Sequence, residues 1–206
     1  QVLAWEAGPL LVLPVGLVIL GQTLLDVSND RSSLVRNAPV LAGVGLGAIL
    51  AFGVHAVAGW QTALVAGTPA LLTLGTVVVI ATAEAAKGFG GTARQLAAVD
   101  IGLGVVGLLV FRFGFTEQWG TFSNRLDTLF RSDGIAETYG LFSADAFGFL
   151  FLLGLTLFLA LPAMVWGVNL ARSDRSGWLV ASSYAWVLFG LAVIQVRFVG
   201  ELAPFL

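Results

Sequence analysis

Residues 96–145 decide the fold class. They read LAAVDIGLGVVGLLVFRF over Leu96–Phe113 and then GFTEQWGTFSNRLDTLFRSDGIAETYGLFSAD over Gly114–Asp145. The first stretch suits a membrane-spanning helix, which needs about 20 predominantly apolar residues. The second carries seven charged and six aromatic side chains. Connections of this length are usually functional or disordered, and the aromatic content argues against plain disorder. We therefore expect residues 114–145 to form a long loop at the working face.

The composition of the whole chain indicates an integral membrane protein. Of its 206 residues, 58% are hydrophobic and only 11% are charged, and the mean hydropathy is +0.94. A typical soluble domain is about a quarter charged. Cysteine is absent and histidine occurs once, which excludes disulfides, thiolate metal sites and histidine clusters. The net charge of −2 gives no basis for nucleic-acid binding.

Apolar segments long enough to span a bilayer recur along the chain and do not alternate as barrel strands would. We expect an all-α, polytopic bundle of transmembrane helices, because a span must satisfy its own backbone hydrogen bonds. Residues 1–206 would be part of one transmembrane domain that continues beyond both ends, because the chain starts at Gln1 and stops within an apolar run. The six expected spans, followed by a truncated seventh from Phe198, are Gly8–Leu25, Ala38–Ala58, Ala63–Ala83, Leu96–Phe113, Ala146–Leu170 and Trp178–Val196.

The distribution of basic residues predicts the orientation. Three short connections, residues 26–37, 84–95 and 171–177, carry two basic residues each and lie on one side if every span crosses once. The opposite side holds the long 114–145 loop. The positive-inside rule therefore places this loop outside the cell.

Other polar or glycine-rich features are better explained by structure than by chemistry. Gly102, Gly104 and Gly107 match a dinucleotide-binding pattern, but they lie inside an apolar span, where small residues favour helix packing. His55 is expected to be a packed or interfacial residue. Asp100 lies one turn into a span and remains a weak candidate for a proton relay or a structural role.

Two residues on the expected external side are stronger candidates for a functional role. Glu137 lies in DGIAET, where a loop carboxylate can accept a hydrogen bond from an incoming amide or bind a hard divalent cation. Arg197 lies at the junction of two apolar runs, where its guanidinium suits a lipid phosphate. The alternatives are a solvated acid at Glu137 and, at Arg197, an ion pair with Glu201 or a topological anchor.

The order of these motifs resembles the catalytic subunit of oligosaccharyltransferase, in particular the single-subunit archaeal enzymes of the GT-C type. That family has a Ser/Thr-Ile/Val-Xaa-Glu motif on an external loop before a pair of transmembrane helices. The matching residues here are Gly134-Ile135-Ala136-Glu137. The family's second helix leads into an Arg-Phe corner, matched by Arg197-Phe198, and Trp5-Glu6-Ala7-Gly8 resembles a family helix start. The likeness covers nearly this whole chain and about the second half of the family's membrane domain.

The resemblance implies transfer of an oligosaccharide from a polyprenyl (dolichyl) phosphate or diphosphate to asparagine in Asn-Xaa-Ser/Thr. Glu137 would be the catalytic residue that contacts the acceptor asparagine beside a Mn²⁺ or Mg²⁺ ion. Gly134 and Ile135 would belong to the acceptor loop, and Arg197 would bind the lipid phosphate. The implied partners are a lipid-linked oligosaccharide, an acceptor polypeptide and membrane lipid.

The sequence departs from the family pattern in ways that limit the expectation. Gly134 replaces the usual hydroxyl residue. Residues 147–153 lack the arginine with which bacterial members select an upstream acid, so we expect no such selection. The family's early acidic metal ligands and its soluble domain would lie outside this chain, which is expected to be inactive alone.

Three other classes remain open. Another polyprenyl-phosphate glycosyltransferase would share the architecture and act on sugars or lipids. A secondary transporter would need discontinuous helices and midplane charges, whereas the charges here cluster at one face. A structural subunit would tolerate neutral substitutions at Glu137 and Arg197.

Overall fold

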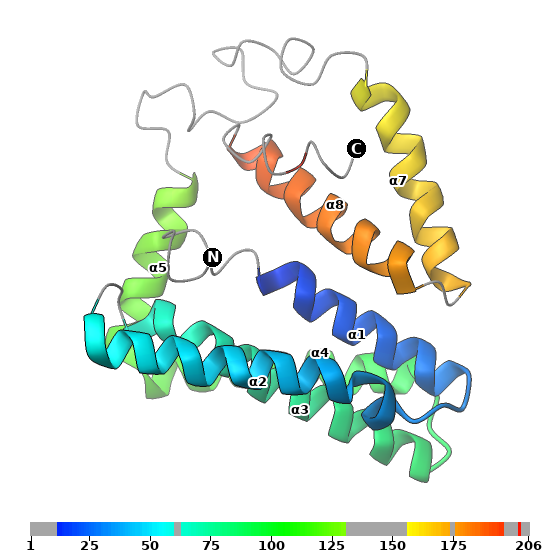
Figure 1. Cartoon of the computed structure of the whole chain (residues 1–206), viewed down its shortest axis with the longest axis horizontal. Helices are drawn as coiled ribbons and strands as arrows, with labels where there is room; N and C mark the ends of the chain where they lie inside the picture. The colour runs from blue at the N-terminus through cyan, green and yellow to red at the C-terminus, as the bar shows by residue number, and fades with distance from the viewer. Residues whose placement is uncertain (1–11, 60–62, 131–155, 174–175, 196–201, 203–206) are drawn as a thin grey trace. The chain divides into compact units, whose positions relative to one another are not determined.

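A computed structural model describes residues 12–59, 63–130, 156–173, 176–195 and 202, and its regular structure is entirely α-helical in this part of the chain (Figure 1). The expected all-helical class is therefore confirmed. The helices are α1 (Val12–Ser28), α2 (Ser33–Ala58), α3 (Ala63–Gly88), α4 (Ala93–Gly114), α5 (Thr116–Phe130), α7 (Thr156–Arg172) and α8 (Ser176–Ile194).

Four of the described helices, α2, α3, α4 and α8, are long and apolar enough to cross a membrane. The α1 helix is also apolar but spans only 17 residues. The apolar surface that α4 exposes is consistent with a membrane environment, since soluble monomers rarely expose large apolar patches. Its exposed side chains include Ile101, Leu103, Val105, Val106, Leu108, Leu109 and Val110.

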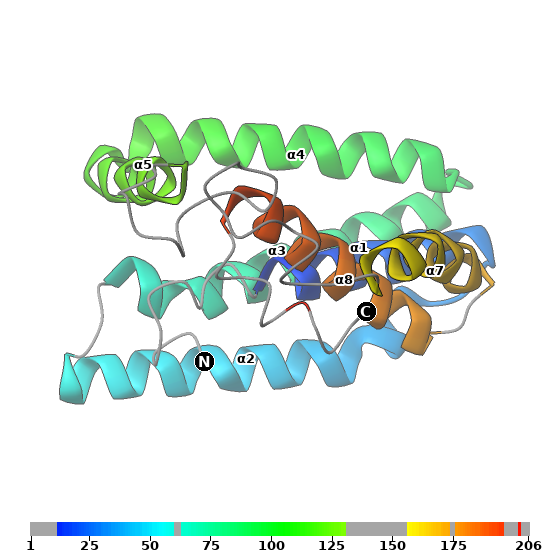
Figure 2. The ribbon, with the colours of Figure 1, turned by 90° about the horizontal axis from the view of Figure 1, so that it is seen from above.

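The chain divides into two compact units, residues 1–116 and 117–206. In the first unit, α1 and α3 lie between α2 and α4, as Figure 2 shows. Each of the two inner helices packs against the other and against both outer helices. The inner helices supply most of the unit's buried core, in which Ile19, Ile80 and Ala83 are almost fully inaccessible.

Local sequence explains where the helices of this unit begin and end. Ser32 caps α2, because its hydroxyl accepts a hydrogen bond from Val35 N–H. Thr92 and Gln95 form a capping box at the start of α4. Gly59 ends α2 in the left-handed region, at φ 60°, where a residue without a Cβ atom is not strained.

The long polar stretch contains a helix that we did not expect. Residues 116–130 form α5, which starts two residues after the end of α4. Its apolar residues recur at helical spacing, so the helix is amphipathic rather than apolar. Trp119, Phe122 and Leu126 are half-buried, whereas Gln118, Asn124 and Asp127 are exposed. The first half of the expected loop is therefore ordered by its own periodicity.

In the second unit, α7 and α8 pack side by side. A small residue allows their close approach: a Cβ atom on Gly167 would lie 2.9 Å from Ser182 Oγ and 3.7 Å from the Trp178 ring. Near this contact, the rings of Trp166 and Trp178 lie 6.2 Å apart. The buried side chains of α7 and α8 are mostly small or aliphatic, among them Ala160, Met164, Ala185, Leu188 and Ala192.

Candidate functional site

The predicted site residues Gly134, Ile135, Glu137 and Arg197 lie outside the described residues. Their assignment therefore stays a prediction. Their positions in the sequence can be given relative to the described helices. Glu137 falls between the end of α5 at Phe130 and the start of α7 at Thr156.

Arg197 lies three residues after α8 ends at Ile194, and buried residues flank it on both sides in the sequence. Gln195 is 1% exposed, and its backbone N–H donates to Leu191 O at 2.8 Å. Leu202 is fully buried. Two anchored residues therefore bracket the predicted phosphate-binding arginine.

The described part of the chain has no group of three or more His, Asp or Glu side chains that could hold a metal ion. The expectation of Mn²⁺ or Mg²⁺ therefore rests on Glu137 and on the resemblance. Two carboxylates that could bind a cation, Asp26 and Glu84, instead have protein partners.

Asp26 forms a buried ion pair at the turn between α1 and α2. Its Oδ1 accepts a hydrogen bond from Arg36 Nη1 at 2.8 Å, and the Asp26 side chain is fully buried. The Asp26 backbone carbonyl accepts from Arg31 N–H, also at 2.8 Å. This carboxylate therefore ties the end of α1 to the first turns of α2.

Glu84 binds the start of α2 from the last turns of α3. Its Oε1 accepts hydrogen bonds from the Ser32 hydroxyl at 2.9 Å and from Leu34 N–H at 2.8 Å. The N–H groups at a helix start lack intrahelical partners, and a carboxylate there interacts favourably with the helix dipole. Glu84 is thus a structural cap. We call Asp26, Ser32, Arg36 and Glu84 the turn cluster.

Lys87 joins the same region more weakly. Its Nζ donates to the backbone carbonyl of Asp30 at 3.0 Å and lies 3.5 Å from Asp30 Oδ1. The Asp30 side chain is 89% exposed, so water competes for this contact. Two basic residues of these short connections, Arg36 and Lys87, are thus engaged in structural contacts.

The weaker sequence candidates also have structural surroundings. Thr82 Oγ1 on α3 lies 2.7 Å from Asp100 Oδ1 on α4, which links the two helices. His55 lies in the last turn of α2. A Cβ atom on Gly102, Gly104 or Gly107 would meet nothing within 4 Å, so the expected close packing at these glycines is not seen in the described residues.

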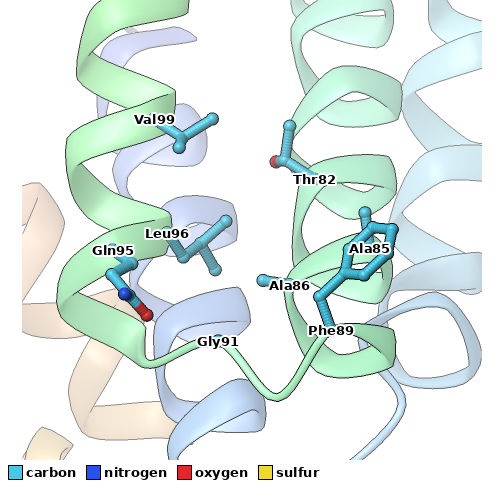
Figure 3. A pocket seen from close by; sticks show the side chains of 8 residues that line it. All are labelled: Thr82, Ala85, Ala86, Phe89, Gly91, Gln95, Leu96 and Val99. Atoms are coloured by element: carbon cyan, nitrogen blue, oxygen red, sulfur yellow. The ribbon is translucent and has the colours of Figure 1, made fainter.

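A groove of about 260 Å³ opens between the end of α3 and the start of α4 (Figure 3). Its lining is almost entirely apolar: Thr82, Ala85, Ala86, Phe89, Gly91, Gln95, Leu96 and Val99. With no titratable side chain in this lining, the groove offers no general acid or base. It is not a candidate active site.

Comparison with known proteins gives no family assignment: no family model, no curated protein and no solved structure matches the chain. Any functional assignment therefore rests on the chain's own residues and on their order.

Proposed function

We propose that this chain is part of a membrane glycosyltransferase of the GT-C type. It would transfer an oligosaccharide from a polyprenyl phosphate or diphosphate to asparagine in Asn-Xaa-Ser/Thr. The observation that carries the proposal is an order along the chain: the Gly134-Ile135-Ala136-Glu137 motif, the paired helices α7 and α8, and then Arg197. The abundance of apolar helices supports a membrane setting for this chemistry.

The role proposed for Glu137 follows from the weakness of the nucleophile. An amide nitrogen is a poor nucleophile because its lone pair is delocalised into the carbonyl group. A carboxylate that accepts hydrogen bonds from the acceptor amide orients that nitrogen towards the sugar carbon. Glu137 would also be one ligand of a Mn²⁺ or Mg²⁺ ion, which would supply positive charge near the reacting groups.

The role proposed for Arg197 follows from the leaving group. When the bond between the sugar and the lipid phosphate breaks, negative charge develops on the phosphate oxygens. A guanidinium group can stabilise that charge with two parallel hydrogen bonds. Its place beyond α8, next to buried Gln195, would hold it near the membrane surface, where a lipid phosphate lies.

The wider architecture of the proposal comprises six spans, with the 114–145 loop and Arg197 on the external side. α1 and α7 overlap the first and fifth expected spans, although neither is among the four described helices that are long and apolar enough to cross a membrane. The excess of basic residues in the three short connections supports this orientation.

The test uses the full-length protein in membranes, supplied with lipid-linked oligosaccharide, Mn²⁺ and an Asn-Xaa-Thr peptide. We expect Glu137→Gln and Arg197→Ala to reduce peptide glycosylation at least about 100-fold, the scale found when one charge-stabilising group is lost. Chelation of the metal should abolish activity, and added Mn²⁺ should restore it.

Matched control variants are Glu117→Gln, an exposed acid in the first turn of α5, and Arg172→Ala, an exposed arginine in the last turn of α7. Both should retain activity. Glycosylation that survives both site substitutions would refute the site assignment. A wild-type protein that modifies no peptide but transfers sugar from a polyprenyl phosphate to a sugar or lipid would favour the related glycosyltransferase class.

A further inference from the structure

Three buried oxygen atoms near the α1–α2 turn have no hydrogen-bond partner among the described residues. They are Asp26 Oδ2, Ser33 Oγ and Asn37 Oδ1. Their residues are 0%, 1% and 0% exposed, so bulk water does not reach them. Because leaving a buried polar atom unpaired is unfavourable, most such atoms in folded proteins are bonded to protein or to ordered water.

The three side chains lie on helix faces that are turned towards the core. Asp26 continues the buried face of α1 that contains Ile19 and Thr23. Ser33 and Asn37 lie one turn apart and begin the buried face of α2. The helices α1 and α2 are in contact, so these two faces meet at the turn.

Hydrogen bonds within the turn connect the segments that carry the three residues. Asn37 Nδ2 donates to Ser33 O at 3.0 Å, which brings the Asn37 amide group back over the first turn of α2. The Asp26 carbonyl accepts from Arg31 N–H, two residues before Ser33, and the Asp26 carboxylate accepts from Arg36, the neighbour of Asn37. Asp26 is therefore fixed to the chain on both sides of Ser33.

The hydrogen-bonding capacity of the three atoms specifies their missing partner. Asp26 Oδ2 is an acceptor, and Asn37 Oδ1 is also an acceptor because the amide nitrogen is the atom bonded to Ser33 O. The Ser33 hydroxyl has one proton to donate. A partner that donates twice and accepts once would satisfy all three atoms, and these are the properties of one water molecule.

Charge balance favours water over a metal cation. Three oxygen atoms of these types could bind sodium, but the Asp26 carboxylate is already paired with Arg36 Nη1 at 2.8 Å. The nearby Glu84 carboxylate is bound to the Ser32 hydroxyl and to Leu34 N–H. A cation beside the Asp26–Arg36 pair would add a second positive charge to that of Arg36 in a buried site. A neutral ligand avoids that penalty.

We propose that one buried water molecule is a permanent part of the α1–α2 turn. It donates to Asp26 Oδ2 and Asn37 Oδ1 and accepts from the Ser33 hydroxyl. The water extends the turn cluster into the core, so that α1 and α2 are joined by the Asp26–Arg36 pair and by this bridge. Buried waters of this kind make about three hydrogen bonds to otherwise unsatisfied groups.

A double-mutant cycle with Ser33→Ala and Asn37→Ala tests the bridge in the full-length protein. Each single substitution should lower the melting temperature by about 2–4 °C. The double variant should lose clearly less than the sum of both shifts, because the first substitution already removes the water. Because Ser33 Oγ and Asn37 Oδ1 do not bond directly, coupling between the two substitutions would indicate a shared partner. Additive losses would overturn the proposal.

Ser28→Ala paired with Asn37→Ala provides the matched control. The Ser28 hydroxyl donates to Leu24 O within its own helix, so this cycle should be additive. Equal melting temperatures in sodium, potassium and choline chloride at one ionic strength are expected. A melting temperature raised by only one of the metal ions would mean that a cation, and not water, occupies the site. An experimental structure that shows no ordered density between the three oxygens, at a resolution that shows other buried waters, would also overturn the proposal.

Discussion

The α1–α2 turn and the α7–α8 pair hold helices together by different means. At the turn, the buried Asp26–Arg36 pair and the Glu84 carboxylate bind specific atoms across helix ends. Between α7 and α8, no hydrogen bond or ion pair is needed at the contact between Gly167 and Ser182, where the absence of a Cβ atom allows the helices to approach. Lipid tails are as apolar as the helices, so association inside a membrane depends on packing and polar contacts rather than on apolar burial.

This difference predicts different responses to substitution. Polar contacts at the turn fix which atoms meet, and they should be sensitive to loss of charge. The close contact between α7 and α8 should be sensitive to added volume.

The largest effect is expected from Arg36→Met, which leaves the fully buried Asp26 carboxylate without its cation. Breaking a buried ion pair on one side costs about 3–5 kcal/mol, and the partial exposure of Arg36 should place the loss near the lower end. The free energy of unfolding in mixed micelles measures it. Combining this change with Asp26→Asn should recover part of the loss; a double variant less stable than Arg36→Met alone would contradict the explanation.

Gly167→Leu should have the next largest effect. The new side chain must displace Ser182 and Trp178, and overpacking of this kind costs about 1–3 kcal/mol. Unfolding of the purified protein, followed by tryptophan fluorescence, would measure the loss. Gly190→Ala on α8 is the control, because a Cβ atom there meets nothing within 4 Å. Equal losses at both glycines would mean that close packing at Gly167 is not the cause.

Glu84→Gln should cost about 0.3–1 kcal/mol. The amide oxygen can still accept from Ser32 and Leu34, so this change removes mainly the interaction between a negative charge and the start of α2. Glu84→Leu should cost more, because it also leaves the α2 N–H group without this acceptor. Thermal melts of both variants check the order. Equal losses would argue against a contribution from the hydrogen-bond acceptor, and an unchanged melting temperature in Glu84→Gln would argue against a contribution from charge.

Lys87→Gln should have the smallest effect, below about 0.5 kcal/mol, because its partner Asp30 is largely exposed. A melting temperature within error of wild type is expected at both low and high salt. A loss comparable with that of Arg36→Met would show that exposed contacts matter at this turn, and it would remove the distinction between its buried and exposed polar groups.

The sequence predicted most of the helices, because apolar runs long enough to span a bilayer form few structures other than helices. The expected span 63–83 begins where α3 begins but ends five residues early. The last turns of α3 contain Glu84 and Lys87, and their charge led to a prediction that ended too early. In the structure, Glu84 accepts a hydrogen bond at the start of α2. Tertiary partners of this kind cannot be identified from apolar length alone.

The α5 helix and the candidate site illustrate two other limits. The spacing of Trp119, Phe122 and Leu126 carries an amphipathic helical signal, which the high charge of the segment obscured. For Glu137 and Arg197, the sequence supplies order and chemistry but not distance. Their roles depend on how close the two groups come to one substrate, and that distance depends on the fold of the segments that carry them.

The contact of Glu84 with Leu34 N–H joins residues 50 positions apart in the chain. A ribosome that adds about 5–20 residues per second needs roughly 2.5–10 s to make that interval. During this time α2 has been synthesised but its start lacks the Glu84 carboxylate. The start of α2 therefore acquires this acceptor only after the end of α3 has been made, so the final hydrogen bonds of α2 depend on the helix that follows it.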